Sequence, residues 1–228
     1  LATMMVGRSV ILDVEKSVSS PKQVILDIKD LRVNDDRKLK AVKNLNLQVR
    51  AGEIVGIAGV EGNGQRELVQ AITGLRKIEG GSVEIIGVNA THLSPHKIHE
   101  LGVAHVPEDR EKDGLVSSYS IADNSVLNRF DEAQFSKAGV RQFGAIRALA
   151  ERLVKTFDVR TPSIDTPASS LSGGNKQKLV IARELNWSPK LLIADQPTRG
   201  VDVGSIEFIH NQIVAARDAG SAVLLVSA

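Results

Sequence analysis

Residues 171–178, Leu-Ser-Gly-Gly-Asn-Lys-Gln-Lys, constrain the fold more than any other stretch of the sequence. Ser172 is a typical helix cap, and Leu179, Ala182 and Leu185 after it fall on one helical face. Two glycines at a helix start leave backbone N–H groups uncovered where the helix dipole is positive, which suits an anion and most often a phosphate. A plain flexible loop is the alternative interpretation, so the neighbouring segments have to discriminate between the two.

Composition narrows the class of protein. The chain has 228 residues, of which 42% are hydrophobic and 25% charged, which is typical of a globular domain that buries a core. A formal net charge of +2 does not indicate binding to nucleic acid. The absence of cysteine excludes a disulfide framework and thiolate metal sites. No apolar run approaches the roughly 18 residues that cross a bilayer, and no secretory signal pattern is present.

Strands and helices alternate along most of the chain. A helical block is expected over about 115–187, and the alternation around it predicts an α/β protein with a mostly parallel sheet. We expect strands at 24–33, 41–49, 54–58, 82–86, 103–106, 191–194 and 222–226, and helices at 65–75, 95–101 and 204–219.

A glycine-rich loop, residues 59–64 (Gly-Val-Glu-Gly-Asn-Gly), lies between an expected strand and an expected helix. Glycines let backbone N–H groups turn around phosphate oxygens without Cβ clashes. A full phosphate loop continues with Lys, which neutralises the phosphates, and Ser or Thr, which binds Mg²⁺. Gln65 and Arg66 stand there instead, so the loop can keep its geometry while losing charge and metal; a plain glycine turn is the alternative. The candidate nucleotide-binding residues are Gly59, Gly62, Asn63, Gly64, Gln65 and Arg66.

Together these segments resemble the ATP-binding cassette (ABC) ATPases, from about residue 23 to 228. Residues 171–175 look like the family's signature, and the apolar strand ending in Asp195 looks like its Walker B segment. The resemblance implies an ABC-type P-loop NTPase fold, with a mostly parallel core sheet, an N-terminal antiparallel β part and an inserted helical subdomain at about 115–188. Two such domains close head to tail in the family. The signature residues Leu171, Ser172, Gly173, Gly174 and Asn175 would therefore meet the γ-phosphate held by a partner domain.

The chain departs from the family at positions that carry chemistry. The family's aspartate serves Mg²⁺, and a glutamate after it activates the attacking water. Gln196 stands in that second position and cannot take a proton, a contribution on the order of 10²–10⁴-fold. Glu108 stands where the family usually carries a glutamine that lines the site. The resemblance thus assigns Gln196, Asp195 and Glu108 as candidate catalytic residues, Asp195 as a weak Mg²⁺ ligand, and Gly200, Val201 and Asp202 as the D-loop that communicates between the two sites.

Finer details resemble importers of simple sugars and nucleosides, whose ATPase subunit carries two cassettes in one polypeptide. Residues 50–54, 106–110 and 196–200 look like the second cassette, and residues 61–65 resemble the nucleoside branch. The resemblance implies ATP and Mg²⁺ as ligands, and the first cassette and membrane-spanning permease subunits as partners, with no nucleic acid. It implies a cytoplasmic position at the inner face of the cell membrane. Residues 1–22 are expected to be the tail of the preceding cassette or a linker, and 23–228 a nucleotide-binding domain truncated at its C-terminus.

A good signature beside a poor phosphate loop leads to a specific hypothesis. The chain would complete the ATP site of its partner cassette, while its own site turns over little ATP and the isolated domain is nearly inactive. The rival is a soluble cassette protein outside transport, such as a translation factor acting on ribosomes. Those proteins usually keep both glutamates and carry a strongly basic linker, and neither feature is found here.

Overall fold

The computed structural model describes residues 16–227, which form two compact units. The helical unit comprises Val106–Trp187 and Pro197–His210. The sheet unit comprises the described residues up to His105, Ser188–Gln196, and the described residues from Asn211 on. Each unit is therefore assembled from segments that lie far apart in the sequence. The expectation of a tail or linker at 1–22 falls largely outside the described residues.

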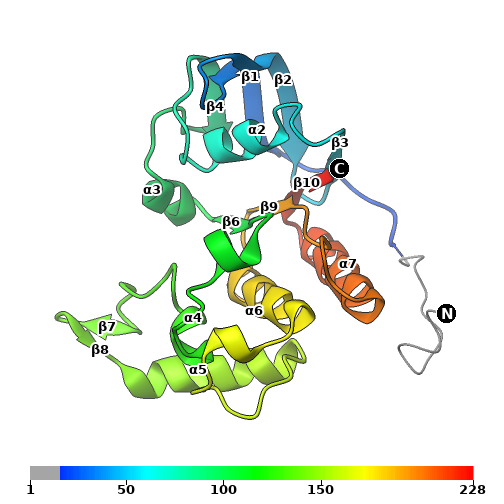
Figure 1. The fold of residues 1–228 in the computed structure, drawn as a ribbon. Coiled ribbons are helices and arrows are strands. Elements are labelled where there is room, and N and C mark those ends of the chain that lie inside the picture. Colours follow the sequence, from blue (N-terminus) through cyan, green and yellow to red (C-terminus); the bar gives the residue numbers. More distant parts are fainter. Residues whose placement is uncertain (1–15, 228) are drawn as a thin grey trace. The chain divides into compact units, whose positions relative to one another are not determined.

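The sheet unit begins with an antiparallel sheet of strand order β2-β1-β4-β5 (Figure 1). Leu26 of β1 is paired with Val49 of β2 on one side and with Ile85 of β4 on the other. Side chains alternate across a strand, so this register turns one apolar face of the sheet inward. The strands are β1 Val24–Asn34, β2 Lys40–Arg50, β4 Gly80–Ile85 and β5 Val88–Asn89.

The second sheet of this unit has the strand order β3-β10-β9-β6, and β10 runs parallel to both of its neighbours. All five residues of β9 are buried, as expected for an inner parallel strand with a continuous apolar run. The expectation that 54–58 is also a buried strand is only partly correct: β3 is half exposed because it stands at the edge of these four strands. The strands are β3 Ile54–Ala58, β6 Val103–Val106, β9 Leu191–Asp195 and β10 Ala222–Ser227.

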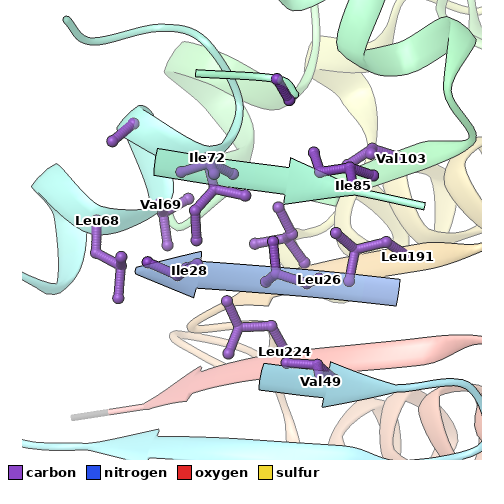
Figure 2. Close-up of a cluster of buried hydrophobic side chains, with 14 of the residues drawn as sticks. Leu26, Ile28, Val49, Leu68, Val69, Ile72, Ile85, Val103, Leu191 and Leu224 are labelled. Carbon is purple, nitrogen blue, oxygen red and sulfur yellow. The ribbon is translucent and has the colours of Figure 1, made fainter. Parts of the chain in front are cut away.

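The core of the sheet unit is formed where α2 (Gln65–Ile72) packs its apolar side between the two sheets (Figure 2). Leu68, Val69 and Ile72 of the helix are buried in one cluster with Leu26 and Leu224 from the two sheets. Full burial of side chains of this size stabilises a fold by about 1.5–3 kcal/mol each. This packing holds the start of α2, and the glycine loop before it, against the sheet. The short helix α3 (Pro95–Glu100) follows and is capped by Ser94.

The helical unit contains less helix than the sequence predicts. Between two of its helices the chain forms the hairpin β7–β8, whose two-residue turn places both Ala138 and Gly139 at positive φ. Such a turn suits the twist of a hairpin and is incompatible with a continuing helix. The elements are the π-helical turn η1 Arg110–Gly114, α4 Ile121–Asn124, β7 Ser136–Lys137, β8 Val140–Arg141, α5 Phe143–Thr156, the 3-10 turn η2 Ala168–Ser170 and α6 Gly173–Leu185.

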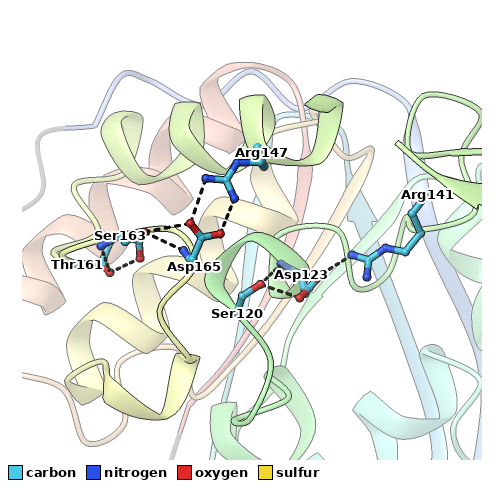
Figure 3. Close-up of polar contacts among 7 residues, drawn as sticks. All are labelled: Ser120, Asp123, Arg141, Arg147, Thr161, Ser163 and Asp165. Atoms are coloured by element: carbon cyan, nitrogen blue, oxygen red, sulfur yellow. Dashed lines mark hydrogen bonds and ion pairs between the residues drawn. The ribbon is translucent and has the colours of Figure 1, made fainter. Parts of the chain in front are cut away.

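Ion pairs join the connecting segments of the helical unit to its helices (Figure 3). Arg141 of the hairpin pairs with Asp123 of α4, and Arg147 of α5 pairs with Asp165 in the loop that leads to the signature. The last helix, α7 (Val203–Asp218), starts in the helical unit and ends in the sheet unit. Among residues 16–227, no helix is both long and apolar enough to span a bilayer.

Candidate functional site

The glycine loop and Asp195 lie at the same edge of the parallel sheet. Ala58, the last residue of β3, pairs with Ser227, and Asp195, the last residue of β9, pairs with Val226. Folds with parallel sheets bind their ligands at this carboxyl edge. The sequence prediction that places a loop between a strand and a helix at 59–64 is confirmed.

Gly64 shows why a glycine is needed at the end of this loop. Its φ is +96°, and a Cβ there would lie 2.6 Å from the carbonyl oxygen of Ala41. Any other residue would therefore be strained in its backbone and would clash with β2. Gly64 is also the N-cap of α2, and no side chain of the described residues caps this helix start. The first turn of α2 is thus directed at the loop, as a phosphate-binding helix would be.

The side chain of Gln65 folds back over the loop. Its amide Nε2 donates to the carbonyl oxygen of Val60 at 3.1 Å, and its Oε1 accepts from the backbone N–H of Asn63 at 3.1 Å. The side-chain amide of Asn63 donates to the same Val60 oxygen at 3.1 Å. A Cβ on Gly59 would lie 2.7 Å from the Gln65 nitrogen. The loop therefore satisfies several of its polar groups internally.

Asp195 is a buried carboxyl group at the sheet edge. Its exposed fraction is only 6%, and this burial raises its pKa from the usual 3.8 to about 6, against the opposing influence of the Arg66 charge. Burial has this effect because the carboxylate loses the stabilising solvation of water. Near neutral pH the group is ionised, and its negative charge is partly compensated by Arg66.

The raised pKa of Asp195 predicts how an Asp195→Asn variant behaves. A carboxyl group whose pKa is higher in the folded than in the unfolded state favours folding most when it is protonated in both states. For Asp195 this is the case at pH 4 and below, and the contribution to the free energy of unfolding is lost as the pH rises through about 6. At pH 8 we expect the variant to be more stable than the wild type by up to about 3 kcal/mol, and near pH 4 the gap should close. Urea unfolding of both proteins at pH 4.5 and pH 8 measures this. A gap that does not change with pH would contradict the prediction.

The residues at this edge offer few protein oxygen ligands to a magnesium ion. Mg²⁺ takes oxygen ligands, and Asp195 is the single carboxylate among the positions that the resemblance assigns to the metal. Arg66 carries no acceptor atom, and Gln196 offers only a neutral amide. In the part of the chain that the structure describes, no three His, Asp or Glu side chains are grouped closely enough to hold a metal ion.

Gln196 follows Asp195 in an uncommon backbone conformation. Its φ is +46°, in the left-handed region, and its N–H donates to the carbonyl oxygen of Val226 at 2.9 Å. A side-chain-bearing residue held there stores about 1–3 kcal/mol of strain, and such residues concentrate at functional sites. The turn ends β9 directly after Asp195, where the resemblance places the residue that activates water.

The signature forms the start of α6 in the helical unit. The predicted cap is confirmed: the Ser172 hydroxyl accepts the backbone N–H of Asn175 at 3.4 Å and the Asn175 side-chain amide at 2.9 Å. The Asn175 side-chain oxygen in turn accepts the N–H of Arg160. Gly174 needs to be a glycine, because a Cβ there would lie 2.6 Å from a carboxylate oxygen of Asp202. The helix start is thus held by its own side chains and by close packing.

The D-loop residues lie beside the signature within the helical unit. Asp202 caps α7: its carboxylate accepts the N–H of Ser205 at 3.0 Å and the Ser205 hydroxyl at 2.7 Å. The hydroxyl contact holds the pKa of Asp202 below its usual value. A pocket of about 790 Å³ opens between the two helix starts, lined among others by Ser172, Asn175, Asp202 and Ser205. The signature therefore lies on a concave part of the surface of the helical unit.

Two arginines that sequence reasoning did not single out join the loop at 106–110 to the D-loop. Arg199 forms an ion pair with Glu108, the candidate catalytic carboxylate. Arg110 donates to the carbonyl oxygens of Arg199 at 2.8 Å and Gly200 at 3.1 Å, and its guanidinium fills the space beside Gly173. The partners are about ninety residues apart in sequence, so no local pattern could have identified these contacts.

The structure thus divides the predicted site residues between the two units. The sheet unit brings together the glycine loop, Arg66, Asp195 and Gln196. The helical unit brings together the signature, the D-loop and Glu108 with its partner Arg199. One group has the features of a phosphate loop without its usual charge, and the other presents a capped helix start on a concave surface.

The chain is similar in sequence to known proteins. The model of the family described as "ABC transporter" matches residues 42–199. The nucleoside import ATP-binding protein NupA of Lactococcus lactis is 51% identical over the whole chain, which covers 45% of NupA. The guanosine import ATP-binding protein NupO of Bacillus subtilis is 48% identical, again over the whole chain and 44% of NupO. The chain thus spans somewhat less than half the length of these relatives.

The fold is also found among solved structures. The dimeric ATP-binding cassette MJ0796, in a post-hydrolysis state with ADP and phosphate, superposes with a TM-score of 0.74 at 24% identity. The match covers 89% of this chain and 88% of that one. A nucleotide-free ATP-binding cassette from an ABC transporter gives a TM-score of 0.73 at 20% identity, with 90% of this chain and 82% of that chain covered. The predicted ABC-type α/β fold is confirmed by these likenesses.

Proposed function

Because the chain belongs to the ABC transporter family, we propose that it is an ATP-binding domain of an importer for nucleosides or simple sugars. In this proposal its signature completes the ATP site of a partner cassette, and its own loop contributes little turnover. The observation that carries the proposal is the contrast between a capped, accessible signature helix and a phosphate loop that has Gln65 in place of lysine. Relatives named for the import of nucleosides, guanosine and glucose support the class of solute.

The proposed partners are a first cassette on the same polypeptide and membrane-spanning permease subunits. The relatives are more than twice as long as the matched region, which leaves room in them for a second cassette. In the proposal residues 23–228 form one nucleotide-binding domain, with a helical subdomain at about 115–188, that works at the cytoplasmic face of the membrane. The rival proposal of a translation factor has no comparable support, because these relatives are named import proteins.

In the proposed mechanism each group of residues does a separate part of the work. ATP is bound by the partner's loop, and Ser172, Gly173 and Gly174 approach its γ-phosphate. The N–H groups at the start of α6 and the helix dipole then stabilise the charge that develops during transfer to water. On this chain's own loop, Gln196 orients a water but cannot accept its proton. The hydrogen bonds from Arg110 to the carbonyl oxygens of Arg199 and Gly200 hold the D-loop beside the signature.

This proposal predicts that the purified chain alone hydrolyses ATP only at background level. Gln65 and Arg66 remove the lysine charge and one metal ligand, and Gln196 removes the general base, worth on the order of 10²–10⁴-fold. Phosphate release by the wild type, Gln196→Glu and Asp195→Ala measures this. Rapid turnover by the wild type that is lost in Asp195→Ala would show a functional site on this loop and overturn the proposal.

A further inference from the structure

We propose that Gln65 holds the glycine loop closed to polyphosphates, so that this one side chain sets the nucleotide affinity of the loop. The inference rests on the proposed function, which assigns residues 59–66 as a nucleotide-facing loop. It goes beyond the loss of a lysine charge, because it gives the residue that replaces lysine an active role against binding.

The chemistry of the amide group distinguishes glutamine from lysine at position 65. A carboxamide carries both a donor and an acceptor, and Gln65 uses both within the loop, on the Val60 carbonyl and the Asn63 N–H. A lysine ammonium has donors only, so it could bond to the Val60 carbonyl but could not accept the N–H of Asn63. Lysine would therefore leave this N–H for a phosphate oxygen, whereas glutamine occupies it.

The Gln65 amide also fills space beside the loop backbone. The Gln65 nitrogen lies 2.7 Å from the position that a Cβ of Gly59 would take, so the amide packs closely beside the glycine backbone. Among residues 16–227, no atom outside Gly62 and its two chain neighbours lies within 4 Å of the corresponding position on Gly62. An anion that approached the backbone at Gly59 would have to displace the Gln65 amide first. Because Gly59 has no side chain, the Gln65 amide has room to fold over the loop.

A second side-chain hydrogen bond crosses the same turn. Asn63 donates its side-chain amide to the Val60 carbonyl that also accepts from Gln65. Val60 itself is 75% exposed, so this carbonyl lies in a segment of the loop that water and ligands can reach. A phosphate that opens the loop must break both hydrogen bonds of Gln65, and the neutral glutamine offers it no positive charge in return. Each neutral hydrogen bond that binding does not have to break is worth about fivefold in the affinity for the phosphate ligand.

The test is the binding of ATP and of inorganic triphosphate to the chain by calorimetry, with a chelator present. Gln65→Met keeps the length of the side chain but removes donor and acceptor, and Gln65→Lys restores a charge. We expect Gln65→Met to bind both probes about five- to tenfold more tightly than the wild type. Gln142→Ala is the matched control, because it also loses an amide-to-carbonyl bond, at 3.0 Å to Val140, but in the helical unit. It should leave binding unchanged.

Hydrogen exchange of the backbone N–H of Asn63 gives a second, independent test of the closed loop. In ¹⁵N-labelled protein its hydrogen exchange should accelerate in Gln65→Met, since the N–H loses its acceptor, and should be unchanged in Gln142→Ala. Affinity of a folded Gln65→Met that equals or falls below that of the wild type overturns the closed loop. If Gln65→Lys alone gains affinity, charge is the whole effect, and the proposed function stands without the closure. If no variant binds either probe, the closure and the assignment of the loop to nucleotide both fall.

Discussion

Replacing Ser172 with arginine is expected to abolish ATP turnover by the longer polypeptide, by on the order of 10²-fold or more, while this domain stays folded. The substitution places a bulky cation at the start of α6, on the surface of the pocket shared with Asp202 and Ser205. A partner that carries ATP could then not close on the helix N-terminus. Loss of the cap itself costs only about 0.5–2 kcal/mol, which a folded domain usually survives.

The measurement is the ATPase activity of the complete protein, together with a melting curve of this domain. Ser163→Arg is the matched control, because the Ser163 hydroxyl also accepts a backbone N–H, that of Asp165 at 3.1 Å, on an exposed turn of the same unit. It should cost similar stability and leave turnover intact. Full activity in a folded Ser172→Arg protein would mean that the signature faces no nucleotide, and the proposed shared site would be wrong.

Replacing Arg183 with alanine is expected to destabilise the helical unit by about 3–5 kcal/mol. Arg183 and Glu184 are 5% and 2% exposed and form an ion pair at 2.8 Å near the end of α6. Arg183 also donates to the carbonyl oxygen of Gly114 at 2.8 Å. Its removal leaves the Glu184 carboxylate buried with the amide of Asn128 as one remaining donor. Removing one partner of a buried ion pair is among the larger single losses a domain can suffer.

Urea unfolding followed by circular dichroism measures this loss. The free energy of unfolding of a native protein is about 5–15 kcal/mol, so a loss of this size would bring a domain at the lower end of that range close to unfolding. Arg152→Ala, on the exposed side of α5, is the control and should change stability by less than about 0.5 kcal/mol. Replacing Arg183 and Glu184 together by leucines should restore part of the stability, because neither charge of this pair is then left buried without the other. A loss below about 1 kcal/mol in Arg183→Ala would contradict the assignment.

The sequence alone determined the features that depend on neighbouring residues. Alternation of strands and helices, the glycine loop after β3 and the Ser172 cap could all be predicted, because each follows from the periodicity or geometry of a few consecutive residues. The hairpin β7–β8 was missed within a segment expected to be helical. Its turn residues, Ala138 and Gly139, needed a left-handed backbone that hydrophobic periodicity does not reveal.

Only the tertiary structure decided which distant groups meet. Three contacts join residues that lie far apart in the sequence. They are the hydrogen bond from Arg110 to Gly200, the ion pair of Glu108 with Arg199, and the hydrogen bond from buried Arg183 to Gly114. The raised pKa of Asp195 arises in the same way, since burial is a property of the packed core and not of the residue. The identity of Gln65 could be read directly, whereas the direction of its amide could not. The hydrogen-bond partners of a side chain are the groups that the fold places near it, and the identity of one residue does not reveal which groups these are.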